Sequence, residues 1–330
     1  MDSSYCPGSP LHDVSTLKRP IWMPAPVMSG SSPLAFRPVT PMAMEEILPY
    51  LEFDHGRTTD FSYGGILMWV DFFKYEYCIF SDTLFIKGLV EDNTSLPAFS
   101  LPLGRLPLAE SVNMVRDYCR QHSILTEFSA VPAMYGDEMW KLGAKRVIPM
   151  PGWSDYLYDI HSMSSLKGKK MSKKRNHVNR FMSLYPEVLT EDVEPKNAVE
   201  ALSFMDVYDC EADGAPMELV ESALTRKMLN LIACGQTHFE GIILRVGDRI
   251  VGFSIGDVKR DTLYVHIEKA TRSIPGSYEM VCNAFVKRML EKYPDLKFVN
   301  REDDGGDEGL RRSKMSYHPI AILEKNNIIF

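Results

Sequence analysis

The chain has 330 residues, of which 45% are hydrophobic and 25% are charged. This length exceeds what one hydrophobic core usually supports, so two domains are expected. The formal net charge of −7 disfavours the whole molecule as a non-specific nucleic-acid binder. The six cysteines include no Cys-x-x-Cys pair, which argues against a disulfide framework and a zinc site. Since neither a signal peptide nor an apolar run of about 18 residues is found, we expect a cytoplasmic protein without a transmembrane segment.

The first half of the chain mixes predicted helices and strands. Residues 1–35 are rich in Pro, Ser and Gly, which predicts a flexible N-terminal extension. A helix is expected over residues 41–51, with Thr40 as its N-cap. Two aromatic and β-branched runs, 69–80 and 82–90, predict a β-hairpin. The remaining elements expected in this half are a strand, a helix and two strands, over 99–104, 108–122, 124–132 and 155–162.

The second half has a clearer order of elements. Three helices are predicted first, over 169–184, 198–210 and 216–234. Three strands follow, over 239–246, 250–258 and 262–270. A loop that contains Gly276 then leads to a long helix over 277–292 and to two strands, over 296–303 and 321–325. Three strands, a glycine-bearing loop, a long helix and a strand form the core order of the GNAT acyltransferase fold, and a weaker version of this order occupies residues 77–130.

This order of elements predicts an α/β (α+β) fold with two tandem GNAT-like domains. Each domain would hold a mixed, largely antiparallel sheet flanked by helices. The N-terminal domain is expected to span residues 36–165. The C-terminal domain, with the candidate active site, is expected to span 166–330. No residue-level repeat relates the two halves, so the tandem is inferred from pattern alone.

The segment 167–181 is strongly basic, with seven Lys or Arg residues and no acid. On a helix, Lys170, Lys174 and His177 would lie near one face, while Val178 and Phe181 would anchor another. Such a surface is suited to phosphate groups, since it holds several cations on a rigid element. The alternative is a solvated helix face, because basic runs are common.

A second candidate site lies around the loop before the long helix of the second half. Four residues of this loop precede the helix N-terminus, where free N–H groups favour anions: Arg272, Ser273, Gly276 and Ser277. On the preceding strand, alternation would place His266 and Glu268 on one face and Lys269 on the other. The alternative is a core histidine with a structural pairing of Glu268 and Lys269.

A third candidate site, residues 300–319, combines acidic and basic side chains around adjacent glycines. Acyl transfer to an amine needs a base, a donor for the oxyanion and an acid for the leaving group. The residues suited to these roles are Glu302, Lys314, Tyr317 and His318. The alternative is a solvated loop with ion pairs. The acidic run lacks the spacing of a calcium-binding loop, and we expect no bound metal.

The blocks 154–181, 265–278 and 300–325 resemble the signature segments of the phosphatidylglycerol lysyltransferase C-terminal domain family. The resemblance spans roughly residues 36–330. That family is similar in fold to tandem GNAT domains, and it transfers an aminoacyl group from tRNA to a lipid. The resemblance implies functional roles for Lys174, Arg175, Asn176, His177, His266, Glu268, Lys269, Asn300, Arg301, Glu302, Asp303, Lys314, Tyr317 and His318.

These observations favour an acyltransferase that moves an aminoacyl group from charged tRNA to a lipid or small-molecule acceptor. The catalytic set is expected to be Glu268 or Glu302 as base, with Lys314, Tyr317 or His318 as hydrogen-bond donor. The other positions, with Arg272, Gly276 and Ser277, are expected to bind the substrate that donates the acyl group. One alternative is a CoA-dependent N-acyltransferase, with acyl-CoA as donor. The other is a non-catalytic module that binds a ligand or a partner. No tightly bound cofactor is expected under any of these hypotheses.

Overall fold

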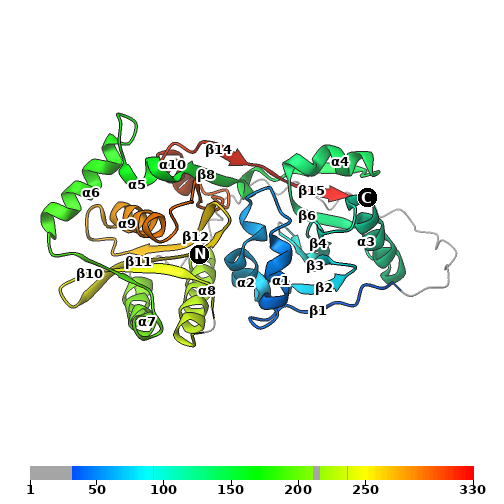
Figure 1. Cartoon of the computed structure of the whole chain (residues 1–330), viewed down its shortest axis with the longest axis horizontal. Coiled ribbons are helices and arrows are strands. Elements are labelled where there is room, and N and C mark those ends of the chain that lie inside the picture. Colours follow the sequence, from blue (N-terminus) through cyan, green and yellow to red (C-terminus); the bar gives the residue numbers. More distant parts are fainter. Residues whose placement is uncertain (1–31, 92, 211–215, 236) are drawn as a thin grey trace, which may run out of the picture.

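The computed structural model describes residues 32–91, 93–210, 216–235 and 237–330. Within these ranges the chain forms two mixed sheets flanked by helices, which lie side by side along the longest axis of the molecule (Figure 1). The predicted extension over residues 1–35 lies outside the described residues, apart from its last four. Among those four, Leu34 is buried in the hydrophobic core of the N-terminal half. That core therefore begins before residue 36.

The sheet of the N-terminal half has the strand order β1-β2-β3-β4-β6-β15-β7, and β5 pairs with β3. Its neighbouring strands are antiparallel, apart from β4 and β6. The strands are β1 (Arg37–Pro38), β2 (Glu76–Phe80), β3 (Thr83–Val90), β4 (Asn93–Phe99), β5 (Leu103–Gly104), β6 (Glu127–Pro132), β7 (Arg146–Pro149) and β15 (Lys325–Ile329). The helices are α1 (Met44–Leu51), α2 (Tyr63–Phe73), α3 (Leu108–His122) and α4 (Gly136–Lys141), with short 3-10 helices η2 (Thr59–Phe61), η3 (Ala133–Tyr135) and η4 (Pro151–Trp153).

The sheet of the C-terminal half has the order β14-β8-β13-β12-β11-β10-β9 and is antiparallel, apart from β12 and β13. Its strands are β8 (Asp155–Asp159), β9 (Leu189–Asp192), β10 (Glu240–Val246), β11 (Arg249–Lys259), β12 (Thr262–Ala270), β13 (Phe298–Asn300) and β14 (Ala321–Leu323). Its helices are α5 (Ile160–Ser165), α6 (Ser172–Leu184), α7 (Pro195–Cys210), α8 (Pro216–Ala233), α9 (Ser277–Lys292) and α10 (Glu308–Met315). None of the helices in the described ranges is long and apolar enough to cross a bilayer.

The helices cover both faces of the C-terminal sheet. α9, with α5 and α6 packed against it, covers one face, and α7 and α8 cover the other (Figure 1). Helix α2 of the N-terminal half also packs on the α7–α8 side, where Met68 joins the core formed by those helices. The opposite side of α2 contributes Ile66 and Leu67 to the core of the N-terminal half. Helix α2 is therefore the packed link between the two halves.

The chain crosses between the two halves at the edge of the C-terminal sheet that is formed by β14 and β8. Strand β8 precedes the boundary predicted at residue 165, yet it pairs with β13 and β14 of the C-terminal sheet. Strand β15 follows β14 and inserts between β6 and β7 of the N-terminal sheet (Figure 1). The sheets therefore do not divide at residue 165. Asp155 begins β8 and Lys325 begins β15, so the first residues of both crossing strands lie at the junction.

The hairpin predicted over 69–90 is wrong in its first strand. Residues 69–73 are the end of α2, and β2 begins only at Glu76. The helix begins after Ser62, whose hydroxyl accepts a hydrogen bond from Gly65 N at 3.0 Å. Because α2 is buried from both sides, it has no polar face, and its apolar sequence does not differ from that of a strand.

Two smaller differences between the predicted elements and the structure concern loops. The strand predicted over 99–104 is split, because β4 ends at Phe99 and β5 holds only Leu103 and Gly104. Helix α10 occupies part of the segment that was expected to be a loop. Its N-terminus is capped by Asp307, whose Oδ1 accepts from Leu310 N at 2.6 Å.

Candidate functional site

Residues Asn300 to Asp303 lie at the junction of the two halves, where β13 ends. Asn300 is fully buried, and its Nδ2 donates to Asp155 Oδ2 at 2.8 Å and to Arg57 O at 2.8 Å. Its Oδ1 accepts from Glu302 N at 2.7 Å. One amide thus fixes β8, the loop before η2 and the backbone of Glu302. The segment 300–303 is therefore held rigidly before its acidic side chains meet any ligand.

Glu302 is held in a strained backbone conformation, with a φ of 57°. This left-handed region costs a non-glycine residue energy and is often found at functional sites. The carboxylate Oε1 lies 2.6 Å from His266 Nδ1 and accepts from Thr59 Oγ1 at 3.3 Å. Among the described residues, both hydrogen bonds use Oε1, which leaves Oε2 for a substrate. The Glu302 side chain is 20% exposed, so a substrate can reach it.

His266 connects Glu302 to a second carboxylate, Asp257, which is buried. Its Nε2 lies 2.5 Å from Asp257 Oδ1, and the histidine side chain is completely buried. Burial opposes the positive charge, but the hydrogen bonds to Asp257 and Glu302 raise the pKa of His266 to about 10. At neutral pH the ring is therefore an imidazolium that donates to both carboxylates. It cannot accept a proton, and it acts by orienting Glu302.

The pH dependence of stability should report this imidazolium. A group whose pKa is raised on folding stabilises the protein fully below its unfolded pKa of about 6.5. That contribution is lost as the pH rises through the folded pKa of about 10. We expect the difference in unfolding free energy between the wild type and His266→Gln to be largest below pH 6.5 and to shrink steadily toward pH 10. Urea denaturation at pH 6, 8 and 10 measures it, and a difference that is independent of pH would contradict this charge assignment.

The prediction that His266 and Glu268 lie on the same face of β12 is wrong. His266 faces Asp257 and α2, while Glu268 points to the other side of the sheet, where it meets Arg301. Lys269 returns to the α8 side and pairs with Glu221 at 2.8 Å. The reason is a β-bulge: Val265 pairs with Gly256 and Ile267 with Ile255, which leaves His266 as an extra residue. A bulge reverses the alternation beyond it, and bulges often occur next to active sites.

Gly64, in the first turn of α2, packs directly against this pair. Its N–H donates to Asp257 Oδ1 at 2.8 Å, and an added Cβ would lie 2.2 Å from His266 Nε2. The sequence around Gly64 gave no sign of this contact, because it depends on how the halves pack. The absence of a side chain allows α2 to close over the imidazolium.

Gly64→Ala should therefore destabilise the protein. Overpacking of this kind costs about 1–3 kcal/mol, because either the helix or the histidine must move. Gly136→Ala is the matched control, since the nearest atom to its added Cβ is 3.6 Å away, in ordinary contact. Urea midpoints measure both variants. Equal midpoints would show that α2 is free to shift away from His266.

Arg301 and Glu268 bridge a gap between β12 and β13. These strands pair only over 262–264 and 298–300, and within the described residues no strand pairs with 265–270 on that side. Arg301 Nε donates to Glu268 Oε2 at 2.9 Å, and Arg301 Nη2 lies 2.7 Å from the same oxygen. The guanidinium also lies 4.7 Å from the centre of the Tyr317 ring. The gap thus offers an unpaired strand edge, and an ion pair crosses it.

Lys314 lies beneath the segment 300–303, on the inner side of α10. Its Nζ donates to Arg301 O at 2.5 Å and to Asp303 O. The residue is 7% exposed, and burial lowers the pKa of its ammonium, although nearby carboxylates oppose this. Two of its three N–H groups are therefore used to hold the backbone on either side of Glu302.

A buried lysine and four carboxylates meet beside this centre. Lys325 Nζ lies 2.8 Å from Asp60 Oδ2 and 2.9 Å from Asp155 Oδ1, and its side chain is 1% exposed. Burial opposes its charge, but Asp155, Asp60, Glu91 and Asp303 together raise the pKa of Lys325 well above its usual value. Burial also raises the pKa of the Asp303 carboxyl to about 6. These charges join β15, β8 and η2, and Asp303 is the one residue among them that was predicted from the sequence as a site residue.

The predicted residues of the basic segment fix α6 in place. Lys174 pairs with Glu279 at 3.3 Å and lies 4.2 Å from the centre of the Tyr317 ring. Arg175 Nη1 donates to Leu166 O at 2.6 Å and to Gly168 O at 3.2 Å. His177 is half-buried and Asn176 is exposed. The cations that remain exposed are Lys167, Lys169, Lys170, Lys173 and Arg180.

The loop before α9 is packed between two neighbouring helices. Gly276 has a φ of 81°, and an added Cβ would lie 2.4 Å from His177 O, so the loop touches the α6 backbone. Ser277 Oγ donates to Thr271 O at 2.8 Å. Arg272 pairs with Glu218 on α8 at 3.1 Å. These residues, with Lys269, lie on the α6 and α8 sides rather than with Glu302.

His318 is also separate from the Glu302 centre. It is exposed, has a φ of 55°, and its Nε2 lies 3.2 Å from Lys170 O. Tyr317, its neighbour, is buried between Lys174 and Arg301. Of the predicted catalytic set, the structure therefore brings together Glu268, Glu302, Lys314 and Tyr317, and it places His318 on the surface.

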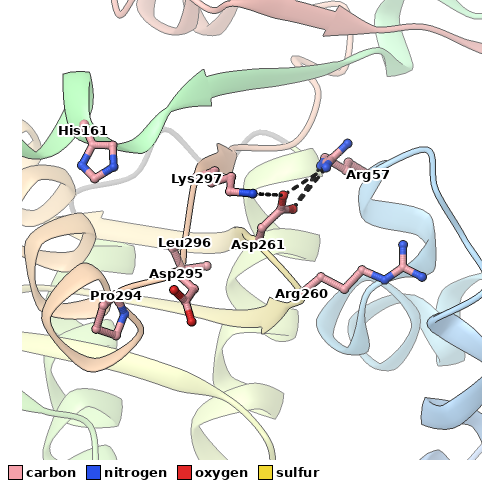
Figure 2. Close-up of a pocket in the computed structure, with 8 residues that line it drawn as sticks. All are labelled: Arg57, His161, Arg260, Asp261, Pro294, Asp295, Leu296 and Lys297. Carbon is pink, nitrogen blue, oxygen red and sulfur yellow. Dashed lines mark hydrogen bonds and ion pairs between the residues drawn. The ribbon is translucent and has the colours of Figure 1, made fainter.

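A surface hollow of about 580 Å³ lies at the opposite ends of β12 and β13 (Figure 2). Figure 2 shows Arg57 and Lys297 reaching toward Asp261 from two sides. The Arg57 guanidinium lies 3.2 Å from Asp261 Oδ2. The hollow is lined by Arg57, His161, Arg260, Asp261, Pro294, Asp295, Leu296 and Lys297. Arg57 connects the hollow to the Glu302 centre, because its backbone carbonyl accepts a hydrogen bond from Asn300.

Comparison with known proteins supports the predicted fold. A crystal structure of a conserved protein of unknown function from Bacteroides thetaiotaomicron VPI-5482 is 27% identical, has a TM-score of 0.80 and matches over 90% of this chain and 99% of that chain. The crystal structure of FemX, a tandem GNAT-like protein, is 8% identical with a TM-score of 0.56, over 90% of this chain and 98% of that chain. The predicted α/β architecture with two GNAT-like sheets is confirmed.

A curated relative matches a smaller part of the chain. "Uncharacterized protein MYCGA3080" of Mycoplasmoides gallisepticum (strain R(low / passage 15 / clone 2)) is 26% identical over 175 residues, which are 52% of this chain and 54% of that protein. The match thus spans about half the length of that relative.

The family itself is shown by a longer match. The family model described as phosphatidylglycerol lysyltransferase, C-terminal, matches residues 55–326, which include Thr59, the Glu302 centre and Lys325. The family and the GNAT-like fold together support an acyltransferase. The chain belongs to the phosphatidylglycerol lysyltransferase C-terminal family.

Proposed function

We propose that this protein transfers an aminoacyl group from a charged tRNA to a hydroxyl or amine of a lipid or small-molecule acceptor. The observation that carries the proposal is Glu302, a partly exposed carboxylate on a strained backbone, oriented by an imidazolium and Thr59. A carboxylate held in this way suits a general base, because its position is fixed before the substrate arrives. The name of the family describes a lysyl transferase, and it supports the aminoacyl donor.

In the proposed reaction Glu302 takes the proton of the acceptor hydroxyl or amine as its oxygen or nitrogen attacks the aminoacyl ester carbonyl. A bond forms between the acceptor and the carbonyl carbon, and the bond to the tRNA ribose oxygen breaks. Glu302 returns this proton to the ribose oxygen, which leaves as a hydroxyl. A further N–H of Lys314, whose Nζ donates to Arg301 O and Asp303 O, would stabilise the oxyanion.

Glu302 is a better base than Glu268, the other predicted carboxylate. Glu268 accepts a hydrogen bond from Arg301 Nε through Oε2, forms an ion pair with Arg301 Nη2 through the same oxygen, and is 12% exposed. Its role is to hold Arg301 across the gap between β12 and β13. We assign Tyr317 a positioning role as well, because its ring is packed between two cations, Lys174 and Arg301.

The phosphates of the donor would bind the exposed side of α6. Lys174 and Arg175 fix this helix through Glu279 and the carbonyls before it, so Lys173 and Arg180 are the helix cations directed to solvent. Two cations on a rigid helix suit a phosphate backbone.

Binding measurements with purified protein test the donor. Thermal shift and filter binding against charged tRNA, uncharged tRNA and CoA, at two salt concentrations, should show preferential binding of charged tRNA. Lys173→Gln/Arg180→Gln should weaken tRNA binding and reduce its salt dependence, whereas the exposed pair Lys196→Gln/Lys297→Gln should not. Binding of CoA alone would favour a CoA-dependent N-acyltransferase. Binding of none of these ligands would favour a non-catalytic module.

A further inference from the structure

Asp257, two residues before the end of β11, is a buried carboxylate that faces the first turn of α2. The residue is 2% exposed, and its Oδ1 accepts a hydrogen bond from Gly64 N at 2.8 Å. Gly64 is the second residue of α2, which begins at Tyr63 after the N-cap Ser62. The free N–H groups and the dipole of a helix N-terminus favour an anion. The N-terminal half therefore supplies the group that fixes Asp257.

The ring of His266 lies between two carboxylate oxygens. Its Nε2 is 2.5 Å from Asp257 Oδ1, and its Nδ1 is 2.6 Å from Glu302 Oε1. Ionised carboxylates accept hydrogen bonds and donate none. A neutral imidazole has a single N–H, so it would satisfy one of these oxygens and turn a lone pair toward the other. Only the imidazolium donates to both carboxylates.

The other titratable groups around the ring do not replace Asp257. The charges that act on His266 are those of Asp257 and Glu302. Burial raises the pKa of Tyr63 on α2 and raises that of Tyr264 on β12 well above its usual value, and the Asp257 charge adds to both shifts. Both phenols are therefore neutral at neutral pH. Two groups on neighbouring segments have acidic partners of their own, Lys259 with Asp54 and His238 with Glu45.

We propose that Asp257 is a positioning residue for the Glu302 base. Held on the first turn of α2, it keeps a proton on each nitrogen of His266, so that the ring donates to Glu302 at neutral and moderately alkaline pH. The proposal rests on the proposed role of Glu302 in transfer. It also gives the N-terminal half a part in the reaction, because Gly64 N fixes the oxygen that faces the ring.

Asp257→Asn removes the charge of this residue and keeps its shape. The amide oxygen can accept from Gly64 N and from His266 Nε2, as Oδ1 of the aspartate does. Loss of an opposite charge at this distance lowers the pKa of a histidine by about 1–3 units. The wild-type ring, with a pKa of about 10, should stay doubly protonated to pH 9. The ring in the variant should lose a proton at a pH about 1–3 units lower than in the wild type.

Side-chain ¹⁵N NMR measures this difference and needs neither a donor nor a reaction. The shifts of both ring nitrogens are followed from pH 6 to pH 10.5, and His266→Gln identifies the signal among those of the eight histidines. The matched control is Asp54→Asn, since Asp54 is 1% exposed and pairs with Lys259 at the same junction. We expect this control to leave the titration midpoint of His266 unchanged.

Transfer kinetics separate positioning from a purely structural role. The ratio of wild-type kcat to Asp257→Asn kcat should be at least about threefold larger at pH 8.5 than at pH 6.5, while the donor KM stays unchanged. The reason is that the ring of the variant is partly neutral only at the higher pH. Added to His266→Gln, Asp257→Asn should lower kcat no further, because Asp257 acts through the ring. For Asp54→Asn the ratio should be the same at both pH values.

Three results would overturn the proposal. The first is a wild-type His266 that loses a proton between pH 6 and pH 8, which needs no variant. The second is an equal midpoint in the wild type and Asp257→Asn, and the third is a kcat ratio that does not change with pH. Circular dichroism confirms that each variant is folded. Absence of transfer in every protein, with a lowered midpoint in Asp257→Asn, would count against the proposed reaction and not against the placement of the protons.

Discussion

Lys325→Met should destabilise the protein by about 3–5 kcal/mol, the usual cost of breaking a buried ion pair on one side. The Lys325 ammonium is buried between Asp60 and Asp155, and Glu91 and Asp303 also act on its charge. Without it, these carboxylates stay buried at the junction of the two halves without a counter-charge. The loss should be smaller at pH 5 than at pH 8, because the carboxyls of Asp303 and Glu91 have raised pKa values and accept protons as the pH falls.

Urea denaturation at the two pH values measures this effect. Lys297→Met is the control, since Lys297 is 69% exposed and lies 3.9 Å from Asp261, and exposed pairs contribute about 0–1 kcal/mol. If both lysine variants lose the same stability, Lys325 does not act as the counter-charge of the junction.

Glu302→Gln should lower kcat for aminoacyl transfer by about 10²–10⁴, while the KM for the donor changes little. The amide keeps the shape of the side chain but cannot accept the acceptor's proton. Glu268→Gln should instead lower stability, because it weakens the bridge to Arg301, and reduce kcat less. Steady-state kinetics with thermal denaturation of each variant separates these effects. A larger fall in kcat for Glu268→Gln would place the base on Glu268.

The sequence was sufficient to identify the segments that form the site but not how they meet. The blocks with His266 and Asn300–Asp303 are recognisable by their polar residues after apolar strands. Asp257 was missed, although an acid at the end of the apolar run IVGFSIGDV was a usable signal. The bulge at His266 leaves no mark in the local sequence, so alternation gave the wrong face for Glu268.

Sequence patterns did not predict which distant segments contact one another. Thr59 and Lys325 are 266 residues apart, and both contact Asp155 at the junction. Gly64 lies in a run whose helical state depends on burial between two cores, which only the packed halves define. The basic segment was correctly predicted as a helix anchored by Val178 and Phe181. Lys174 and Arg175, which were predicted to bind the donor substrate, make contacts that hold the helix in place.

The most direct test of the account is a transfer assay with the whole protein. Labelled aminoacyl-tRNAs are supplied one at a time with phosphatidylglycerol vesicles or a soluble amine, and the label recovered in the acceptor is measured. We expect the wild type to transfer label from at least one aminoacyl-tRNA and Glu302→Gln to do so at least about 100-fold more slowly. Transfer at equal rates by both proteins, or by neither with any charged tRNA, would contradict it.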